Sequence, residues 1–273
     1  MKPSLKKASA ARELDAFRMG PKENIVLPSG MPITIRERNG DDEDILSKLK
    51  DNKSTAAMHN FLAAIVVNPV LTPEDVAKLR IKDKYYIMFK SRIQSLGSDL
   101  TFSHTFTDGD TKTRTVQFDE SLDNYDWDFS RPHEEFPFKP ENDEYFKYRC
   151  TPYPKDTMDT DTFEFELVSK KKCRMEYLNG LGESKSLKKN AGDLTINDKL
   201  IIRNFEIQLD NGSWQKVEKF SMFSAREMQE IRSKLDKMDD PFDLLTELIN
   251  PITGNSELVS LFLKEDFFFP LTR

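Results

Sequence analysis

Apolar residues in this sequence come in short runs whose spacing changes along the chain, and this pattern limits the possible folds more than any other feature. The most continuous apolar stretch runs from Phe61 to Val67, far below the about 20 residues needed to cross a bilayer. Runs with a period of two are typical of strands, and runs with helical spacing lie between them. The pattern therefore predicts an α+β protein with no contact to a membrane.

The first part of the sequence predicts a helical block with a β-hairpin on either side. Residues 25–27 and 33–35 flank a Pro-Ser-Gly turn and are expected as two strands. The acidic run 41–44 is interpreted as a helix start rather than a metal site, because carboxylates in a first turn complement the helix dipole. The next expected elements are helices over 56–67, from Thr72-Pro73 and over 84–96 with a stop at Gly97, and a hairpin over 100–118.

The second part of the sequence predicts another small α+β unit. The expected elements are strands over 146–150, 163–168 and 173–178, a capped helix start at Thr195, an alternating run over 205–209 and a turn over 210–212. Ser224 and Glu227 have the spacing of a capping box, in which each side chain satisfies a backbone amide at the start of a helix. A helix is therefore expected directly after Ser224.

Four segments follow from this order of elements. They are a mobile N-terminal arm (1–24), an N-terminal α+β domain (25–118), an acidic-aromatic loop (119–145) and a C-terminal α+β domain (146–273). The loop carries many carboxylates with interleaved aromatic residues, a composition that does not easily close its own core. It is either a surface loop laid against a domain or a segment that becomes ordered on a partner.

Charge and cysteine content exclude several classes of protein. The 273 residues include 41 basic and 47 acidic ones, with a formal net charge of −6, which argues against a nucleic-acid-binding protein because phosphate contacts need a basic surface. The basic run 170–172 is short. Cys150 and Cys173 are too few for a disulfide framework or a four-cysteine metal site and are expected as reduced thiols. Residues 1–19 are charged, with no apolar block, and do not read as a signal peptide.

No catalytic motif is visible. A Walker loop is absent, and residues 179–182 have two of the three glycines of a dinucleotide fingerprint. His59, His104 and His133 are far apart in the sequence and outside known catalytic contexts. His59 lies in a helical run and is expected as a surface or boundary residue rather than a catalytic base. The sequence predicts a protein that is not an enzyme and binds no cofactor.

The order of several short motifs carries a resemblance to a known family. A turn at 27–30 is followed, much later, by 177–180, by the helix start at 220–227 and by an end at 266–270. In this order the chain resembles the baseplate hub assembly proteins of contractile-tailed bacteriophages of the T-even type. Members of that family have a Leu-Pro-Ser turn, a Leu-Thr-Gly turn, an Ala-Arg-Asp element before a late helix and a Phe-Phe-Trp-Pro-like end.

The resemblance also implies two degenerate zinc-ribbon-like knuckles. Many relatives carry two Cys-x-x-Cys knuckles that together hold zinc, and the aligned positions here include His104, Thr107, Asn250 and Thr253. Only His104 still has a side chain that coordinates zinc. The hairpins are therefore expected to persist without the metal, with apolar contacts from Phe102, Leu258, Val259 and Leu261 in its place.

The function implied by the resemblance is non-enzymatic. The protein would be a chaperone or scaffold for the central hub of the phage tail baseplate, working in the host cytoplasm on other tail or hub proteins. The alternatives are a permanent baseplate subunit of the virion and, from another class, a hub-associated cell-wall hydrolase. The expected partner-binding residues are aromatic, and the oligomeric state is left open. These residues are Tyr125, Trp127, Phe129, Phe136 and Phe138 in the acidic loop, and Phe267, Phe268 and Phe269 near the end.

Overall fold

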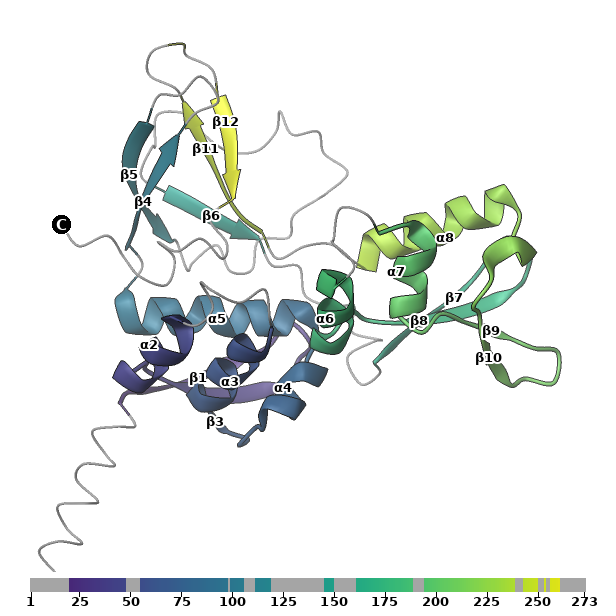
Figure 1. Cartoon of the computed structure of the whole chain (residues 1–273), viewed down its shortest axis with the longest axis horizontal. Helices are drawn as coiled ribbons and strands as arrows, with labels where there is room; N and C mark the ends of the chain where they lie inside the picture. The colour runs from purple at the N-terminus through teal and green to yellow at the C-terminus, as the bar shows by residue number, and fades with distance from the viewer. Residues whose placement is uncertain are drawn as a thin grey trace, which may run out of the picture.

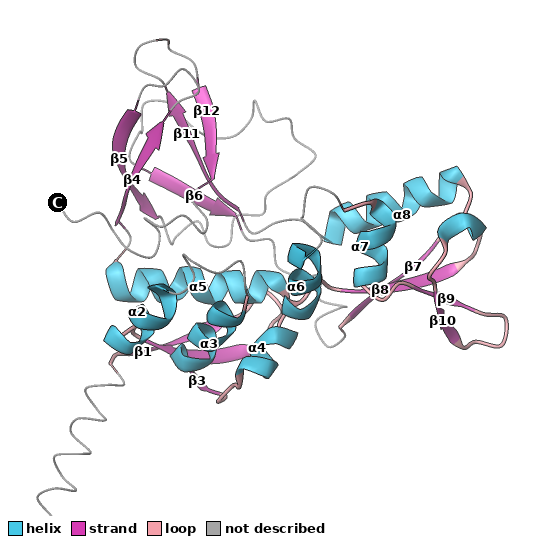
Figure 2. Ribbon diagram, in the orientation of Figure 1, coloured by secondary structure: helices cyan, strands magenta, loops and turns pink. Residues whose placement is uncertain are grey.

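The computed structural model confirms a mixed α+β fold. It describes residues 20–47, 55–97, 99–105, 111–118, 145–149, 161–188, 194–238, 243–249, 253 and 256–260. These residues form two α+β units and a separate β-sheet (Figures 1 and 2). Residues 20–97 are called the first unit below, and residues 161–238 the second unit.

The first unit is a three-stranded antiparallel sheet with helices packed against it. Its strands, in the order β1-β2-β3, are β1 (Lys22–Val26), β2 (Pro32–Arg36) and β3 (Val66–Asn68). Its helices are α2 (Gly40–Ser47), α3 (Ala56–Ile65), α4 (Pro73–Lys78) and α5 (Ile81–Leu96). A core that includes Ile35, Phe61, Leu62 and Ile87 lies between the sheet and the helices.

The second unit is also a small antiparallel sheet with helices packed against it, and it has one strand more than the first unit. Its four-stranded antiparallel sheet, in the order β10-β9-β8-β7, consists of β7 (Thr162–Glu166), β8 (Lys172–Glu176), β9 (Glu206–Gln208) and β10 (Trp214–Lys216). Its helices are α6 (Gly180–Lys188), α7 (Ile196–Ile202), the 3-10 helix η5 (Phe220–Met222) and α8 (Ala225–Met238). Phe205 lies at the centre of its core, against the rings of Phe220 and Phe223.

A five-stranded sheet combines strands from both halves of the chain. Its strands, in the order β12-β11-β6-β5-β4, are β4 (Asp99–Thr105), β5 (Thr111–Phe118), β6 (Tyr145–Arg149), β11 (Asp243–Ile249) and β12 (Ser256–Ser260). β5 and β6 run parallel, and the other neighbours run antiparallel. The expected hairpins β4–β5 and β11–β12 are therefore both present. The boundary drawn before residue 146 lies within β6, a strand that pairs with elements from both sides of it.

The two units share one structural plan. Each begins with a β-hairpin, continues with two helices and a short strand, and ends with a long helix that precedes a hairpin of the five-stranded sheet. The correspondence is in register over much of its length, since β3 and β9 lie 140 residues apart. Thr55 and Thr195, which precede α3 and α7, have the same spacing. The chain therefore contains an internal duplication.

The hairpin turns of the two units have the same backbone conformation and the same backbone hydrogen bond. The amide of Gly30 donates to the carbonyl of Leu27 at 2.7 Å, and the amide of Lys170 donates to Leu167 at 2.8 Å. Gly30 and Lys170 both have a positive φ, of 85° and 68°. Glycine adopts this conformation without cost, whereas lysine is strained in it.

A long helix holds each turn through an acidic residue near its start. The backbone amide of Ser29 donates to Asp83 Oδ1 at 2.9 Å, and the hydroxyl of Ser169 donates to Glu227 Oε1 at 2.6 Å. Asp83 and Glu227 each come three residues after the residue before their helix, α5 or α8. The same tertiary contact thus occurs in both units with different side chains.

Most of the predicted elements are confirmed, with one notable difference. The helix expected over 56–67 ends at Ile65, and Val66–Asn68 form β3, which pairs with β2. Val66 and Val67 are β-branched and Pro69 follows them, so this segment favours an extended backbone over another helical turn. Both α4 and α7 begin with complete capping boxes, and α5 ends at Gly97 with φ 77°.

Candidate functional site: the contact between the two units

Helix α6 of the second unit packs against the first unit, and this contact is the best-defined polar site of the described residues. Figure 1 shows α6 between α4 and α5 on one side and α7 on the other. The helix starts at Asn179, whose Oδ1 accepts from the amides two and three residues ahead at 3.1 and 3.0 Å. Asn39 caps α2 in the same way, at 3.0 and 3.3 Å.

Gly180 allows the two units to approach closely. A Cβ at this position would lie 2.6 Å from His59 Nε2, 2.8 Å from Lys84 Nζ and 3.0 Å from the carbonyl oxygen of Ala77. The last of these is a backbone atom that cannot rotate away. At the equivalent position, Gly40, no atom lies within 4 Å of such a Cβ. The Asn-Gly pair at 179–180 thus combines a helix cap with a residue small enough for the contact.

The backbone of α5 is joined directly to the segment before α6. The amide of Ile81 donates to the carbonyl of Leu178 at 2.9 Å, and Arg80 forms a β-bridge with Asn179. The guanidinium of Arg80 lies over the ring of Tyr177, 4.2 Å from its centroid. A cation above an aromatic face is attracted by the ring quadrupole. The contact therefore fixes the second unit at the start of α5.

A buried ion pair lies at the centre of the contact. Lys84 Nζ is 2.7 Å from Glu183 Oε2, and the hydroxyl of Tyr85 donates to Glu183 Oε1 at 2.9 Å. The side chain of Lys84 is fully buried and that of Glu183 is 14% exposed. Both carboxylate oxygens of Glu183, in the second unit, therefore accept hydrogen bonds from side chains of the first unit. Removing one partner of such a pair leaves the other buried and uncompensated.

His59 completes the cluster as a neutral acceptor. Its Nε2 lies 3.2 Å from Lys84 Nζ, and because an ammonium only donates, we assign the proton of the imidazole to Nδ1. Burial, followed by the charge of Lys84, lowers the pKa of His59. Its position corrects the expectation of a surface or boundary residue, since His59 is 7% exposed.

The electrostatics of the cluster depend on burial. Desolvation lowers the pKa of Lys84, and the adjacent Glu183 opposes this shift. Desolvation and the charge of Glu183 raise the pKa of Tyr85, which keeps its hydroxyl protonated as a donor. Lysine, tyrosine, histidine and glutamate are also the groups used for proton transfer in enzymes. Here their donors and acceptors are directed at one another across the contact.

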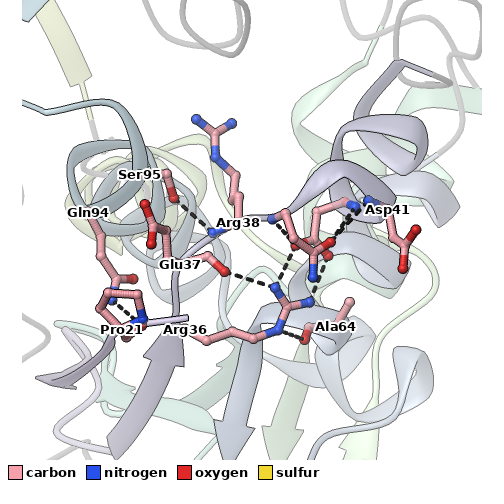
Figure 3. Close-up of polar contacts among 10 residues, drawn as sticks. Pro21, Arg36, Glu37, Arg38, Asp41, Ala64, Gln94 and Ser95 are labelled. Carbon is pink, nitrogen blue, oxygen red and sulfur yellow. Dashed lines mark hydrogen bonds and ion pairs between the residues drawn. The ribbon is translucent and has the colours of Figure 1, made fainter. Parts of the chain in front are cut away.

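A second buried ion pair ties α2 to its own unit. Figure 3 shows the guanidinium of Arg36 between the carbonyl of Glu37, at 2.9 Å, and that of Ala64, at 3.1 Å. It also donates to both oxygens of Asp42, at 2.6 and 2.8 Å. The equivalent of Asp42 in the second unit is Gly182, so this anchor is specific to the first unit.

The partner-binding residues expected from the sequence are not placed by this structure. Tyr125, Trp127, Phe129, Phe136, Phe138, Phe267, Phe268 and Phe269 all lie outside the described residues, as do Thr107, Asn250, Leu261, His133 and Cys150. His104 lies on β4, in register with Lys112 of β5, and Thr253 is exposed between β11 and β12. Phe102, Leu258 and Val259 lie on β4 and β12. The proposed packing of their side chains stays a prediction.

Two further expectations concern metals and thiols. Among the residues that the structure describes, no group of three or more His, Cys, Asp or Glu side chains is placed to hold a metal ion. Cys173 is a free, fully buried thiol, and burial raises its pKa to about 12. Cys173 is thus a core residue of the second unit.

The residues of the contact were missed by sequence reasoning because each looks ordinary alone. Lys84 and Glu183 are 99 residues apart, and charged residues on helices are usually solvent-exposed. One signal was available. Asn-Gly occurs before a helix at 39–40 and again at 179–180, each time with glutamate three residues after the glycine.

Comparisons with known proteins give no identification. No family model, no curated protein and no solved structure matches the chain. Within the described ranges, no helix combines the length and the apolar character that a membrane span requires.

Proposed function

We propose that this protein is a non-enzymatic assembly factor, a chaperone or scaffold for the central hub of a contractile phage tail baseplate. The observation that carries this proposal is the use of the buried ionisable groups. Glu183, Lys84, Tyr85 and His59 bind one another across a contact between two copies of one structural unit. Such a protein joins modules, and the same chemistry serves to hold other subunits.

The phage assignment rests on the order of short motifs. The turn at 27–30 connects β1 and β2, and the serine of the late motif caps α8 at 224–227. The two proposed zinc-ribbon-like knuckles would be the hairpins β4–β5 and β11–β12, each of which follows a long helix. In this proposal the knuckles keep their turns but have lost the ligands of the metal.

The partners in this proposal are other tail or baseplate hub proteins, bound in the host cytoplasm. The acidic segment 119–145 would hold basic patches while its aromatic residues fill pockets, since aromatic residues dominate the binding energy of interfaces. Phe267, Phe268 and Phe269 form a second candidate contact, or alternatively part of the protein's own core. Deleting residues from 267 onward separates these cases. Loss of solubility indicates a core role, whereas loss of partner capture at unchanged melting temperature indicates an interface.

The experiment is affinity capture of the full-length tagged chain from infected cells, followed by mass spectrometry of the bound chains. Enrichment of tail or baseplate subunits is expected, and Trp127→Ala should reduce it. A matched control is Trp214→Ala, on β10 of the second unit. Recovery of only nucleic acid, or of a small substrate that the protein turns over, would overturn the proposal. Mass spectrometry of purified particles then distinguishes a departing chaperone from a retained baseplate subunit.

A further inference from the structure

We propose that the second unit binds helix α2 of a second copy of this chain, in the way that the first unit binds α6. The occupied contact inside the chain provides the template. Because of the internal duplication, each side of this contact has an equivalent elsewhere in the chain. Helix α2 is the equivalent of α6, and the surface of the second unit is the equivalent of the surface that α6 contacts on the first unit. This inference does not depend on the phage assignment.

The element offered is α2 with the residues before it. Asn39 and Gly40 match Asn179 and Gly180, and Glu43 matches Glu183. Gly40 faces open space where Gly180 meets the first unit, and Glu43 is exposed. The residues with which α6 makes its contact are thus repeated on α2. There the glycine and the carboxylate of the glutamate are both accessible.

The surface that receives it is formed by α7 and α8. Counting from the residues before the corresponding helices, Lys199 takes the place of His59, Met228 that of Lys84 and Gln229 that of Tyr85. In the first unit α6 covers these positions. In the second unit Lys199 and Gln229 are exposed and Met228 is half-buried.

The chemistry of the receiving surface is retained although the residues differ. Glu183 binds one cation and one neutral hydroxyl donor. Lys199 provides a cation at the position of His59, and the amide of Gln229 provides a neutral donor at the position of Tyr85, so Glu43 finds both kinds of partner. Met228 replaces a buried lysine with an apolar side chain, which suits the approach of Gly40 without a desolvated charge. The exposed carboxylate of Asp44 adds a second negative charge to the element, near the glutamate that pairs with Lys199.

Three contacts of the template are not repeated. Helix α4, which α6 approaches at the carbonyl of Ala77, has no counterpart in the second unit, where β10 and η5 lie between β9 and α8. Thr55 Oγ1 lies 2.5 Å from Ser184 Oγ, but Thr195 uses its hydroxyl to cap α7 through Asp198. Ser224 is the equivalent of Arg80, so the cation above the ring of Tyr177 has no counterpart in the second unit. The contact between chains is therefore smaller than the one inside the chain, and it also lacks the tether that raises the local concentration. We expect weak binding that depends on protein concentration.

The resulting association is head-to-tail. Each copy offers one element and one surface, which lie on different units, so the interface is heterologous and leads to chains or rings. Sedimentation velocity of the full chain from about 1 µM to about 500 µM, a range that covers weak protein contacts, should show a rising average mass.

Charge reversal tests the pairing. Glu43→Lys and Lys199→Glu should each weaken association about tenfold or more, because like charges would then meet. An equimolar mixture of the two variants should associate again, since each variant supplies the complement that the other lacks. Asp210→Lys and Lys172→Glu are matched reversals at exposed positions outside α2, α7 and α8 and should behave as the original protein.

Fold integrity is checked by the melting temperature, because within its own unit the charge of Glu43 acts on Arg38. A wild-type mass that stays at one chain over the whole range overturns the inference. Association that survives either reversal, or that does not return in the mixture at unchanged melting temperature, overturns it as well.

Discussion

At the scale of single residues, Asp83 and its equivalent Glu227 have pKa values shifted in opposite directions. Burial raises the pKa of Asp83 to about 6, although the Ser29 amide favours its charged form. Glu227 holds the corresponding turn in the second unit, but hydrogen bonds from Lys171 and Ser169 lower its pKa to about 2. One contact thus carries opposite pH dependences in the two units.

Asp83→Asn should change how stability varies with pH. Below about pH 4 both folded and unfolded Asp83 are protonated, and between about 4 and 6 the folded chain keeps the proton longer. Wild-type stability therefore falls as pH rises through this window, and asparagine removes that fall. Relative to wild type, the variant should gain up to about 3 kcal/mol between pH 4 and pH 7, measured by urea unfolding.

The change of the unfolding free energy with pH is the readout for Asp83, and not its value at one pH, because asparagine also changes the contacts of the folded state. Asp210→Asn, at an exposed position of the turn after β9, is the matched control and should keep the profile of the original protein. Parallel pH profiles for wild type and Asp83→Asn would show that Asp83 is ionised normally in the folded protein.

Lys170→Gly should stabilise the protein. Lys170 has φ 68° in the turn where the first unit has Gly30, and a left-handed lysine costs about 1–2 kcal/mol before the greater flexibility of unfolded glycine is counted. The ion pair with Glu166 that would be lost is exposed and contributes little. We expect a net gain of about 0.5–1 kcal/mol. Lys172→Gly, within β8, should instead lose about as much, and a loss at both positions in thermal unfolding would contradict the assignment of strain.

At the scale of elements, the two Asn-Gly helix starts allow a matched comparison. Gly180→Ala places a methyl group against His59, Lys84 and the carbonyl of Ala77, and overpacking of this kind typically costs about 1–3 kcal/mol. Gly40→Ala adds the same methyl group in open space at the start of α2. It should be neutral or stabilising by up to about 1 kcal/mol.

Hydrogen exchange locates the effect of the Gly180 substitution. The amide of Ile81 donates to Leu178 across the contact, so its exchange should accelerate in Gly180→Ala and stay unchanged in Gly40→Ala. Equal stability and equal exchange in the two variants would mean that α6 does not approach the first unit as closely as described.

Sequence patterns predicted most elements because their ends carry local signals. Capping boxes, Gly97 and the turn at 27–30 act over a few residues, and the structure has all of them. β3 was read as helix because its apolar residues continue the pattern of α3, and only pairing with β2 makes it a strand. Tertiary pairing is not visible in a short window of sequence.

At the scale of the whole molecule, the duplication escaped sequence reasoning because equivalent positions keep their role and change their residue. Ile33 and Ile35 correspond to Cys173 and Met175, all buried. The pairing of Lys84 with Glu183 has no local sequence pattern, since the two residues lie far apart in the chain. Backbone geometry and burial preserve the plan even at the equivalent positions where the side chains differ.

The central claim is that the chain works by holding other subunits, with no bond made or broken. Under the proposed assignment to a phage tail baseplate, the most direct measurement is electron microscopy of the particles made after infection by a phage from which the coding sequence has been deleted, with and without the protein supplied from a plasmid. The account predicts that baseplates and complete tails are missing without the protein and return with it. Normal numbers of complete tails in its absence would contradict the account.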